Sequence, residues 1–277
     1  MDTLNYILTA CGGILLNLFV VFSPQVPLAF WSVVTGLLMA LVFRHVSNQK
    51  ALRLVADRTR SQLLAIRLFK DDLGVALGCQ IQLLKAVGLR LFHSVLPAAV
   101  MLVPIALVLI QLALRYEHTP LTTGESVLVE VELSEQDWET YQHVEIEVSD
   151  NMRVETPALR DPRERTITWR VSPIEASEGE LQWQFGGRVE HKNVAIAKDQ
   201  DILQSVSVRR TRTGWLDRIL HPGEASLEIE SPVRAITMEY PKRSTPFFGL
   251  AIPWWATFLV VSMLAALATK PWLKVQF

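Results

Sequence analysis

Residues 95–114 read VLPAAVMLVPIALVLIQLAL, a run of twenty residues that contains no Asp, Glu, Lys or Arg. A helix of about 20 apolar residues is long enough to cross the hydrocarbon core of a bilayer. Pro97 and Pro104 each remove a backbone donor, which a membrane helix tolerates where neighbouring groups satisfy the freed carbonyls. Arg115 and Tyr116 follow directly and are typical of a membrane boundary. The run therefore predicts a membrane-spanning helix.

Other stretches of the chain have the same character. Half of the 277 residues are apolar, and the mean hydropathy of +0.25 is high for a soluble domain. Three further runs contain no charged residue: Leu4–Phe22, Val26–Phe43 and Phe247–Thr269. The sequence therefore predicts an integral membrane protein with an α-helical bundle, whose spans we place at residues 24–44, 95–115 and 246–269.

Charges are distributed unevenly between these runs. Residues 44–94 contain nine Lys and Arg against three Asp, a balance of +6. Residues 117–243 contain fifteen Lys and Arg against twenty-four Asp and Glu, a balance of −9. Short loops rich in Lys and Arg stay in the cytoplasm, whereas a large domain is translocated largely regardless of its charge. We therefore expect residues 45–94 and the tail 270–277 in the cytoplasm, and residues 117–243 on the outer side.

The N-terminal segment, residues 1–23, is compatible with two interpretations. Its polar residues recur every fourth position and form a narrow stripe on one helical face: Asn5, Thr9, Gly13 and Asn17. The segment is either an amphipathic helix that lies in the outer interface or a fourth apolar helix that crosses the membrane. Both interpretations place residue 44 on the cytoplasmic side, so the charge pattern does not distinguish them. Asp2 is the only charge before Arg44, and a cleaved signal peptide is therefore not expected.

Residues 45–94 are amphipathic rather than uniformly apolar. Steps of three and four residues separate the members of an apolar stripe, which is typical of a coiled-coil-like helix: Leu52, Val55, Thr59, Leu63, Ile66, Phe69 and Leu73. Gly74 and Gly78 weaken a helix, so we expect a turn near Lys70–Gly74 and a cytoplasmic helical hairpin. Our candidate contacts for a client or partner are Arg53, Arg60, Arg67, Lys70, Asp71 and Asp72, together with Gln111 in the second span. Asp71 and Asp72 equally suit capping of the second helix, and Gln111 equally suits contact between helices.

Residues 117–243 have the pattern of a β-domain. Short alternating stretches are separated by polar turns rich in Pro and Gly, and we expect strands at Ser126–Leu133, Val144–Ser149, Thr166–Val171, Glu180–Phe185, Val189–Ala197, Val206–Arg210, Ala225–Ile229 and Ala235–Tyr240. About eight strands in about 120 residues predict an immunoglobulin-like β-sandwich. Trp169 and Trp183 are candidates for its core. Residues 214–223 interrupt the strands with a small amphipathic turn.

No motif in the sequence predicts catalysis, a cofactor or a metal. The six histidines are scattered and form no HExxH pattern. Cys11 and Cys79 are the only cysteines, so the β-domain contains no disulfide and no CxxC metal motif. The spans contain no ionisable residue of the kind that transporters use. We therefore expect a protein that is not an enzyme.

The order of these segments resembles the YidC/Oxa superfamily of membrane-protein insertases, and most closely its minimal three-span branch. The resemblance covers Pro24–Leu114 and Phe247–Lys274 and includes the amphipathic helix at Arg53–Phe69. It implies a helix in the interface before the first span, which suits Leu4–Phe22. Two features depart from the family: no span contains the positive residue that several insertases have in their groove, and residues 117–243 replace a short loop.

Two functions follow from this sequence. The first is an insertase-like or chaperone-like protein of a bacterial inner membrane, whose cytoplasmic hairpin contacts hydrophobic client proteins or the ribosome. The alternative is a membrane-anchored subunit without enzymatic activity, whose β-domain binds a protein partner outside the cell membrane. Both place the lipid bilayer among the partners, and neither predicts a nucleic acid or a small-molecule substrate.

Overall fold

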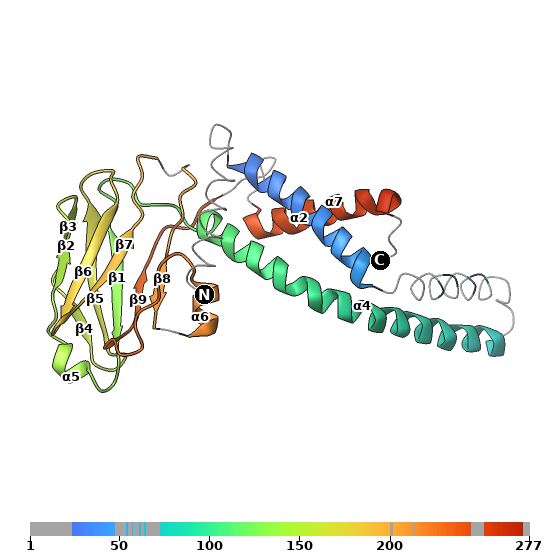
Figure 1. The fold of residues 1–277 in the computed structure, drawn as a ribbon, viewed down its shortest axis with the longest axis horizontal. Helices are drawn as coiled ribbons and strands as arrows, with labels where there is room; N and C mark the ends of the chain where they lie inside the picture. Colours follow the sequence, from blue (N-terminus) through green and yellow to red (C-terminus); the bar gives the residue numbers. More distant parts are fainter. Residues whose placement is uncertain are drawn as a thin grey trace. The chain divides into compact units, whose positions relative to one another are not determined.

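The computed structural model describes these residues of the chain: 24–47, 54, 57, 61, 64, 73–199, 202–212, 214–244 and 252–273 (Figure 1). The chain divides into two compact units. The β unit comprises the described residues of 24–27 and 107–254, and the helical unit comprises those of 28–106 and 255–273. The expected N-terminal helix, Leu4–Phe22, lies outside the described residues.

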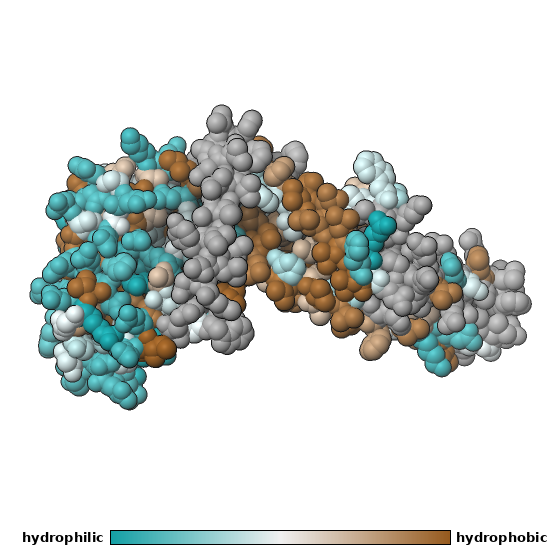
Figure 2. Space-filling view, in the orientation of Figure 1, coloured by the Kyte–Doolittle hydropathy of each residue, from teal (hydrophilic) through white to brown (hydrophobic). Residues whose placement is uncertain are grey.

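Three long helices contain the apolar runs: α2 (Gln25–Val46), α4 (Leu73–Tyr116) and α7 (Trp254–Leu273). Each contains a stretch that is long and apolar enough to cross a membrane, which agrees with the three predicted spans. Figure 2 shows that apolar residues dominate the visible surface of these helices, whereas hydrophilic residues dominate that of the β-domain. In the most apolar window of α2, 39% of the residues are buried, against 11% in α4 and 11% in α7.

Helix α4 is longer than the sequence predicts. The sequence predicts that a cytoplasmic hairpin ends at residue 94 and that a membrane span begins at residue 95. The structure has one continuous helix of 44 residues across this boundary. Pro97 and Pro104 lie inside it and do not end it. Its first residue, Leu73, falls within the expected turn at Lys70–Gly74.

Helix α7 begins later than the sequence predicts. The apolar run starts at Phe247, but Ile252 and Pro253 are not helical and the helix begins at Trp254. Proline fits at the start of a helix because the first backbone N–H groups have no partner within it. Trp254 and Trp255 are therefore the first residues of α7.

Within the helical unit, α2 and α7 approach closely at Gly36. A Cβ atom added to Gly36 would lie 2.2 Å from the carbonyl oxygen of Ser262 and 3.0 Å from Cβ of Ala265. Ser32 and Thr35, on the turn before Gly36, are buried, and the Ser32 hydroxyl donates to the Leu28 carbonyl at 2.7 Å. Small and polar side chains at a helix contact are typical of membrane helices, because they allow the backbones to approach.

The β-domain consists of two antiparallel sheets. Its strands are β1 (Val127–Leu133), β2 (Ile146–Val148), β3 (Met152–Val154), β4 (Leu159–Asp161), β5 (Thr166–Pro173), β6 (Gly179–Phe185), β7 (Arg188–Val194), β8 (Arg209–Thr211) and β9 (Val233–Met238). The larger sheet has the order β3-β5-β1-β9-β8, with β4 also paired to β5, and the smaller sheet has the order β2-β6-β7. Two short helices complete it, α5 (Trp138–Tyr141) and α6 (Trp215–Leu220).

The two sheets share one hydrophobic core. Alternate residues of β1 point inward, and Val129 and Val131 are fully buried. The rings of Trp169 on β5 and Trp183 on β6 lie 6.1 Å apart, and both are buried, which confirms the predicted core positions. Because these two strands belong to different sheets, the sheets face each other across this core as in a sandwich.

Some predicted strands differ from the observed ones. Ala225–Ile229 is not a strand, since only Leu227 forms an isolated bridge, to Arg212. The predicted strand at Val206–Arg210 is observed only from Arg209. Strands β3 and β4 were not predicted, because each has three residues and an alternation cannot be recognised over so short a length.

Candidate functional site

Of the seven sequence-predicted contact residues, one lies in the described part of the chain. Arg53, Arg60, Arg67, Lys70, Asp71 and Asp72 lie outside the described residues. Gln111 lies on α4, and its side-chain oxygen is buried with no hydrogen-bond partner among the described residues. Its backbone carbonyl accepts a hydrogen bond from the Arg115 guanidinium at 3.1 Å. Gln111 is therefore a partly exposed residue whose amide oxygen is buried.

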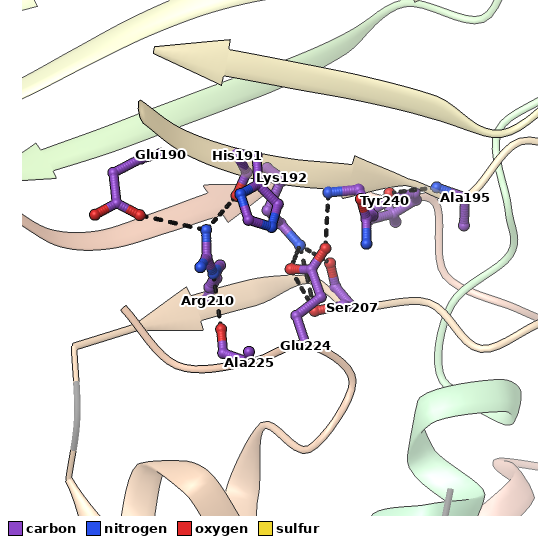
Figure 3. A network of polar contacts seen from close by, with 10 residues as sticks. Glu190, His191, Lys192, Ala195, Ser207, Arg210, Glu224, Ala225 and Tyr240 are labelled. Carbon is purple, nitrogen blue, oxygen red and sulfur yellow. Dashed lines mark hydrogen bonds and ion pairs between the residues drawn. The ribbon is translucent and has the colours of Figure 1, made fainter. Parts of the chain in front are cut away.

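A cluster of charged side chains lies inside the β-domain instead. The inward face of β7 presents Glu190, Lys192 and Val194, so two of its three inward residues are charged. Strand β7 is an edge of the smaller sheet, and β8, which contributes Arg210, is an edge of the larger one. Glu190, Lys192 and Arg210 are all buried. Figure 3 shows how they meet with Glu224, which comes from the loop after α6.

Lys192 is completely buried and has an acceptor for each of its three N–H donors. Its ammonium donates to Glu224 Oε2 at 2.6 Å, to the Ser207 carbonyl at 2.6 Å and to Ser207 Oγ at 3.2 Å. Burial lowers the pKa of Lys192, while the negative charge of Glu224 opposes this change. A buried charge is tolerated where it is paired and fully hydrogen-bonded, and this ammonium meets both conditions.

Arg210 joins the two sheets through its guanidinium. Its Nε donates to the Ala225 carbonyl at 2.7 Å, and its Nη1 donates to the His191 carbonyl on β7. The same nitrogen lies 3.5 Å from Glu190 Oε2, so Arg210 also balances the second buried carboxylate. The cluster thus contains two cations and two anions.

The free edge of β7 is covered by side chains from the other sheet and its loops. Along this edge, backbone groups of alternate residues point away from β6. The His191 carbonyl accepts a hydrogen bond from Arg210. The Asn193 N–H donates to Glu224 Oε1 at 2.8 Å, and the Ala195 N–H donates to the Tyr240 hydroxyl at 3.1 Å (Figure 3). Tyr240 is buried, and burial raises its pKa. These three side chains occupy the position of a missing neighbouring strand, which protects an edge that would otherwise pair with another chain.

A polar groove of about 280 Å³ lies beside this cluster. Its lining consists of Glu178, Gly179, Asn193, Val194, Ala195, Gln204, Ser205, Ser207, Gly223 and Glu224. Ser207 and Glu224 belong to both the buried cluster and the groove. Ser207, whose hydroxyl lies next to a carboxylate and an ammonium, therefore lines the groove.

The segment that forms one wall of the groove also contacts the end of α4. Between Ser205 and Ser207, the N–H of Val206 donates to the Leu114 carbonyl at 2.7 Å. This carbonyl is one of the last four of α4, which have no partner within the helix. The groove wall thus caps the C-terminus of a candidate membrane helix.

The two chain segments that enter and leave the β-domain lie side by side. The Thr119 N–H donates to the Pro241 carbonyl at 2.9 Å, and the Arg243 N–H donates to the Glu117 carbonyl at 2.9 Å. We call these segments, residues 117–119 and 241–243, the stalk. The two segments of the stalk are therefore joined by backbone hydrogen bonds.

Sequence reasoning missed this cluster. Lys192, Ser207 and Glu224 are separated by 15 and 17 residues and match no spaced motif. The available signal was a pair of charged residues, Glu190 and Lys192, at alternate positions of a predicted strand. Such a pair is normally assigned to the solvated face, and only the position of β7 relative to β8 shows that it is buried.

The described residues contain no group of three or more His, Cys, Asp or Glu that could hold a metal ion. Comparison of the chain with protein-family models, with curated proteins and with solved structures gives no match.

Proposed function

We propose that the chain is an integral protein of a bacterial inner membrane, with α2, residues 95–116 of α4, and α7 as its spans. The excess of Lys and Arg in residues 44–94 supports a cytoplasmic location for the hairpin and the C-terminus. The β-domain then lies outside, and its two facing antiparallel sheets support an immunoglobulin-like sandwich.

Within this topology, we propose an insertase-like or chaperone-like function for hydrophobic client proteins. The observation that best supports it is the part of α4 outside the span, residues 73–94. Several of its large apolar side chains are exposed: Leu84, Leu91 and Phe92 are 71%, 65% and 73% accessible. Its only formal charges besides histidine are Lys85 and Arg90, both positive. An exposed apolar surface with a basic character suits hydrophobic segments of nascent proteins that approach an anionic membrane surface.

The sparse packing of the spans is consistent with this function. Only 11% of the most apolar window is buried in α4 and in α7, so their lateral faces are available to lipid or to other membrane helices. A client helix contacting these faces would exchange lipid contacts for helix contacts without first displacing a tightly packed neighbour.

A second candidate function is that of an anchored subunit whose β-domain binds a partner. The hydrogen-bonded stalk and the Val206–Leu114 contact favour it, because they tie the β-domain to the end of α4. In that case the partner binds a face or loop of the β-domain, since the side chains of Arg210, Glu224 and Tyr240 cover the β7 edge.

Site-specific photo-crosslinking separates these functions. A benzophenone amino acid replaces Phe92, which is 73% exposed, or Phe258, which is 1% exposed and serves as the matched control. The insertase-like function predicts adducts between position 92 and many newly synthesised membrane proteins, and none at position 258. Adducts with lipid alone, or with one partner in constant ratio, would contradict client binding on α4. The anchored-subunit function instead predicts a single partner captured from exposed β-domain positions such as Leu159.

A further inference from the structure

We propose that Ser207 is a nucleophile that accepts an acyl group from an ester or amide bound in the neighbouring groove, an activity separate from the function proposed for the membrane spans. Ser207 Oγ lies 3.2 Å from Glu224 Oε2 and 3.2 Å from the ammonium of Lys192. A hydroxyl within hydrogen-bond reach of a proton acceptor, which is itself oriented by a third group, is the arrangement that nucleophilic catalysis by serine requires.

The carboxylate of Glu224 is held in one orientation. Its Oε1 accepts from the Asn193 N–H at 2.8 Å, and its Oε2 accepts from Lys192 at 2.6 Å. With both oxygens fixed, Oε2 remains directed at the Ser207 hydroxyl (Figure 3). The Glu224 side chain is 8% exposed, so little water competes for the proton that Ser207 releases.

Lys192 positions both partners and supplies a compensating charge. Its ammonium contacts Ser207 Oγ and Glu224 Oε2 at once, and it is held in place by the Ser207 carbonyl. Negative charge that develops on Ser207 Oγ therefore faces a fixed cation in a buried setting, where electrostatic stabilisation is stronger than in water. A structural ion pair would explain why Lys192 and Glu224 are buried together. It would not require Ser207, which contacts both of them and lines a groove.

The groove gives a substrate access to Ser207. Its volume of about 280 Å³ accommodates a small acyl group, and its lining includes the polar residues Asn193, Gln204 and Ser205. Gly223 keeps the space above the nucleophile free. A Cβ atom added there would lie 3.2 Å from Ser207 Oγ, so any side chain at this position would crowd the hydroxyl.

The reaction proceeds in two balanced steps. Ser207 Oγ bonds to the substrate carbonyl carbon while its proton passes to Glu224; the bond from that carbon to the leaving oxygen or nitrogen then breaks, and Glu224 protonates the leaving group. Water next attacks the acyl ester on Ser207 and gives its proton to Glu224. The carboxylic acid leaves, and the proton returns from Glu224 to Ser207 Oγ.

Labelling with a fluorophosphonate probe, which reacts with nucleophilic serines, tests the proposal on the full-length protein in mild detergent. Peptide mapping by mass spectrometry should place the adduct on Ser207. The control is Ser205, which lines the same groove but makes no hydrogen bond to Glu224 among the described residues. Ser205→Ala should keep the labelling rate and Ser207→Ala should abolish labelling. Glu224→Gln should slow labelling about a hundredfold, the usual contribution of a general base.

Three results would overturn the proposal. These are a folded wild-type protein that remains unlabelled, an adduct mapped to a residue other than Ser207, and a Glu224→Gln variant that reacts at the wild-type rate. Because the adduct is mapped on the unaltered protein, the first two results do not depend on whether a variant folds. None of them bears on crosslinking from Phe92, so this activity and the proposed membrane function can fail separately.

Discussion

The phenol of Tyr116 donates a hydrogen bond of 2.9 Å to the backbone carbonyl of Pro24, which lies 92 positions earlier in the chain. Tyr116 is the last residue of α4 and is fully buried. Its ring centre lies 6.4 Å from that of Trp254, the first residue of α7. One side chain at the end of α4 therefore contacts both the residue that precedes α2 and the residue that begins α7.

Replacing Tyr116 with Phe should weaken this junction. The substitution removes one partly buried hydrogen bond, and such a bond contributes about 0.5–1.5 kcal/mol to stability. We expect a lower melting temperature for the full-length protein in detergent, measured by intrinsic fluorescence. The matched control is Tyr141→Phe, because the Tyr141 hydroxyl makes no hydrogen bond within the described part of the chain. An equal melting temperature for wild type and Tyr116→Phe would show that the hydrogen bond does not stabilise the junction.

Replacing Lys192 with Met should destabilise the β-domain strongly. The substitution leaves Glu224 as a buried carboxylate without its cation, and breaking a buried pair in this way costs about 3–5 kcal/mol. The double variant Lys192→Met/Glu224→Gln should recover most of the loss, because Gln is neutral and keeps an oxygen for the Asn193 N–H. Urea unfolding followed by tryptophan fluorescence measures all three proteins. If the double variant is less stable than Lys192→Met alone, the unpaired charge is not the cause of the loss.

The sequence pattern was sufficient where one face of an element is apolar over several residues. The alternation of Val127, Val129, Val131 and Leu133 predicts an inward face, and all four side chains are buried in β1. The same reasoning places Trp169 and Trp183 in the core, because a large aromatic residue in an alternating strand is stabilised most when it is buried. Local patterning therefore predicts the long strands and the side chains that they bury.

The pattern was insufficient where a long-range contact decides the outcome. Ala225–Ile229 alternates like a strand, but the Ala225 carbonyl and the Glu224 carboxylate bind side-chain and backbone donors from Arg210, Lys192 and Asn193 instead of a neighbouring strand. These partners are 15 or more residues away, and their proximity depends on which strands form the two sheet edges. The candidate site was unpredictable for the same reason.

Stability should depend on pH through His221. Burial lowers the pKa of His221 below its ordinary value of 6.5, and the nearby positive charge of Arg209 adds to the effect. Between the lowered pKa of the folded protein and pH 6.5, the unfolded chain therefore binds a proton that the folded chain does not, so stability should rise with pH in this window and become independent of His221 above it. His221→Gln should flatten the increase between pH 5.5 and 6.5 in urea unfolding. Identical pH profiles for the two proteins would exclude this role.

The proposed topology predicts which positions an impermeant thiol reagent can reach. After replacement of Cys11 and Cys79 by Ala, single cysteines are introduced at Ser61 and Ser177, both of which are exposed. In spheroplasts, position 177 should react because the β-domain faces outward, and position 61 should react only after permeabilisation. Labelling of position 61 in intact spheroplasts would reverse the orientation of the hairpin.

Replacing a helical glycine with alanine should destabilise the protein at Gly36, where α2 contacts α7, and stabilise it at Gly88, where the added Cβ meets no other atom. At Gly36 an added Cβ would lie 2.2 Å from the Ser262 carbonyl oxygen, a backbone atom that cannot turn aside, so Gly36→Ala forces the helices apart. Overpacking of this kind costs about 1–3 kcal/mol. At Gly88 on α4 nothing lies within 4 Å of the added Cβ, so Gly88→Ala should instead stabilise the helix by about 0.5–1 kcal/mol through reduced backbone entropy in the unfolded chain.

Melting temperatures of the two variants in the same detergent should therefore lie on opposite sides of the wild-type value. Two variants that both melt at or above the wild-type temperature would mean that α2 and α7 do not pack together at Gly36, because a true backbone contact there leaves no room for a methyl group.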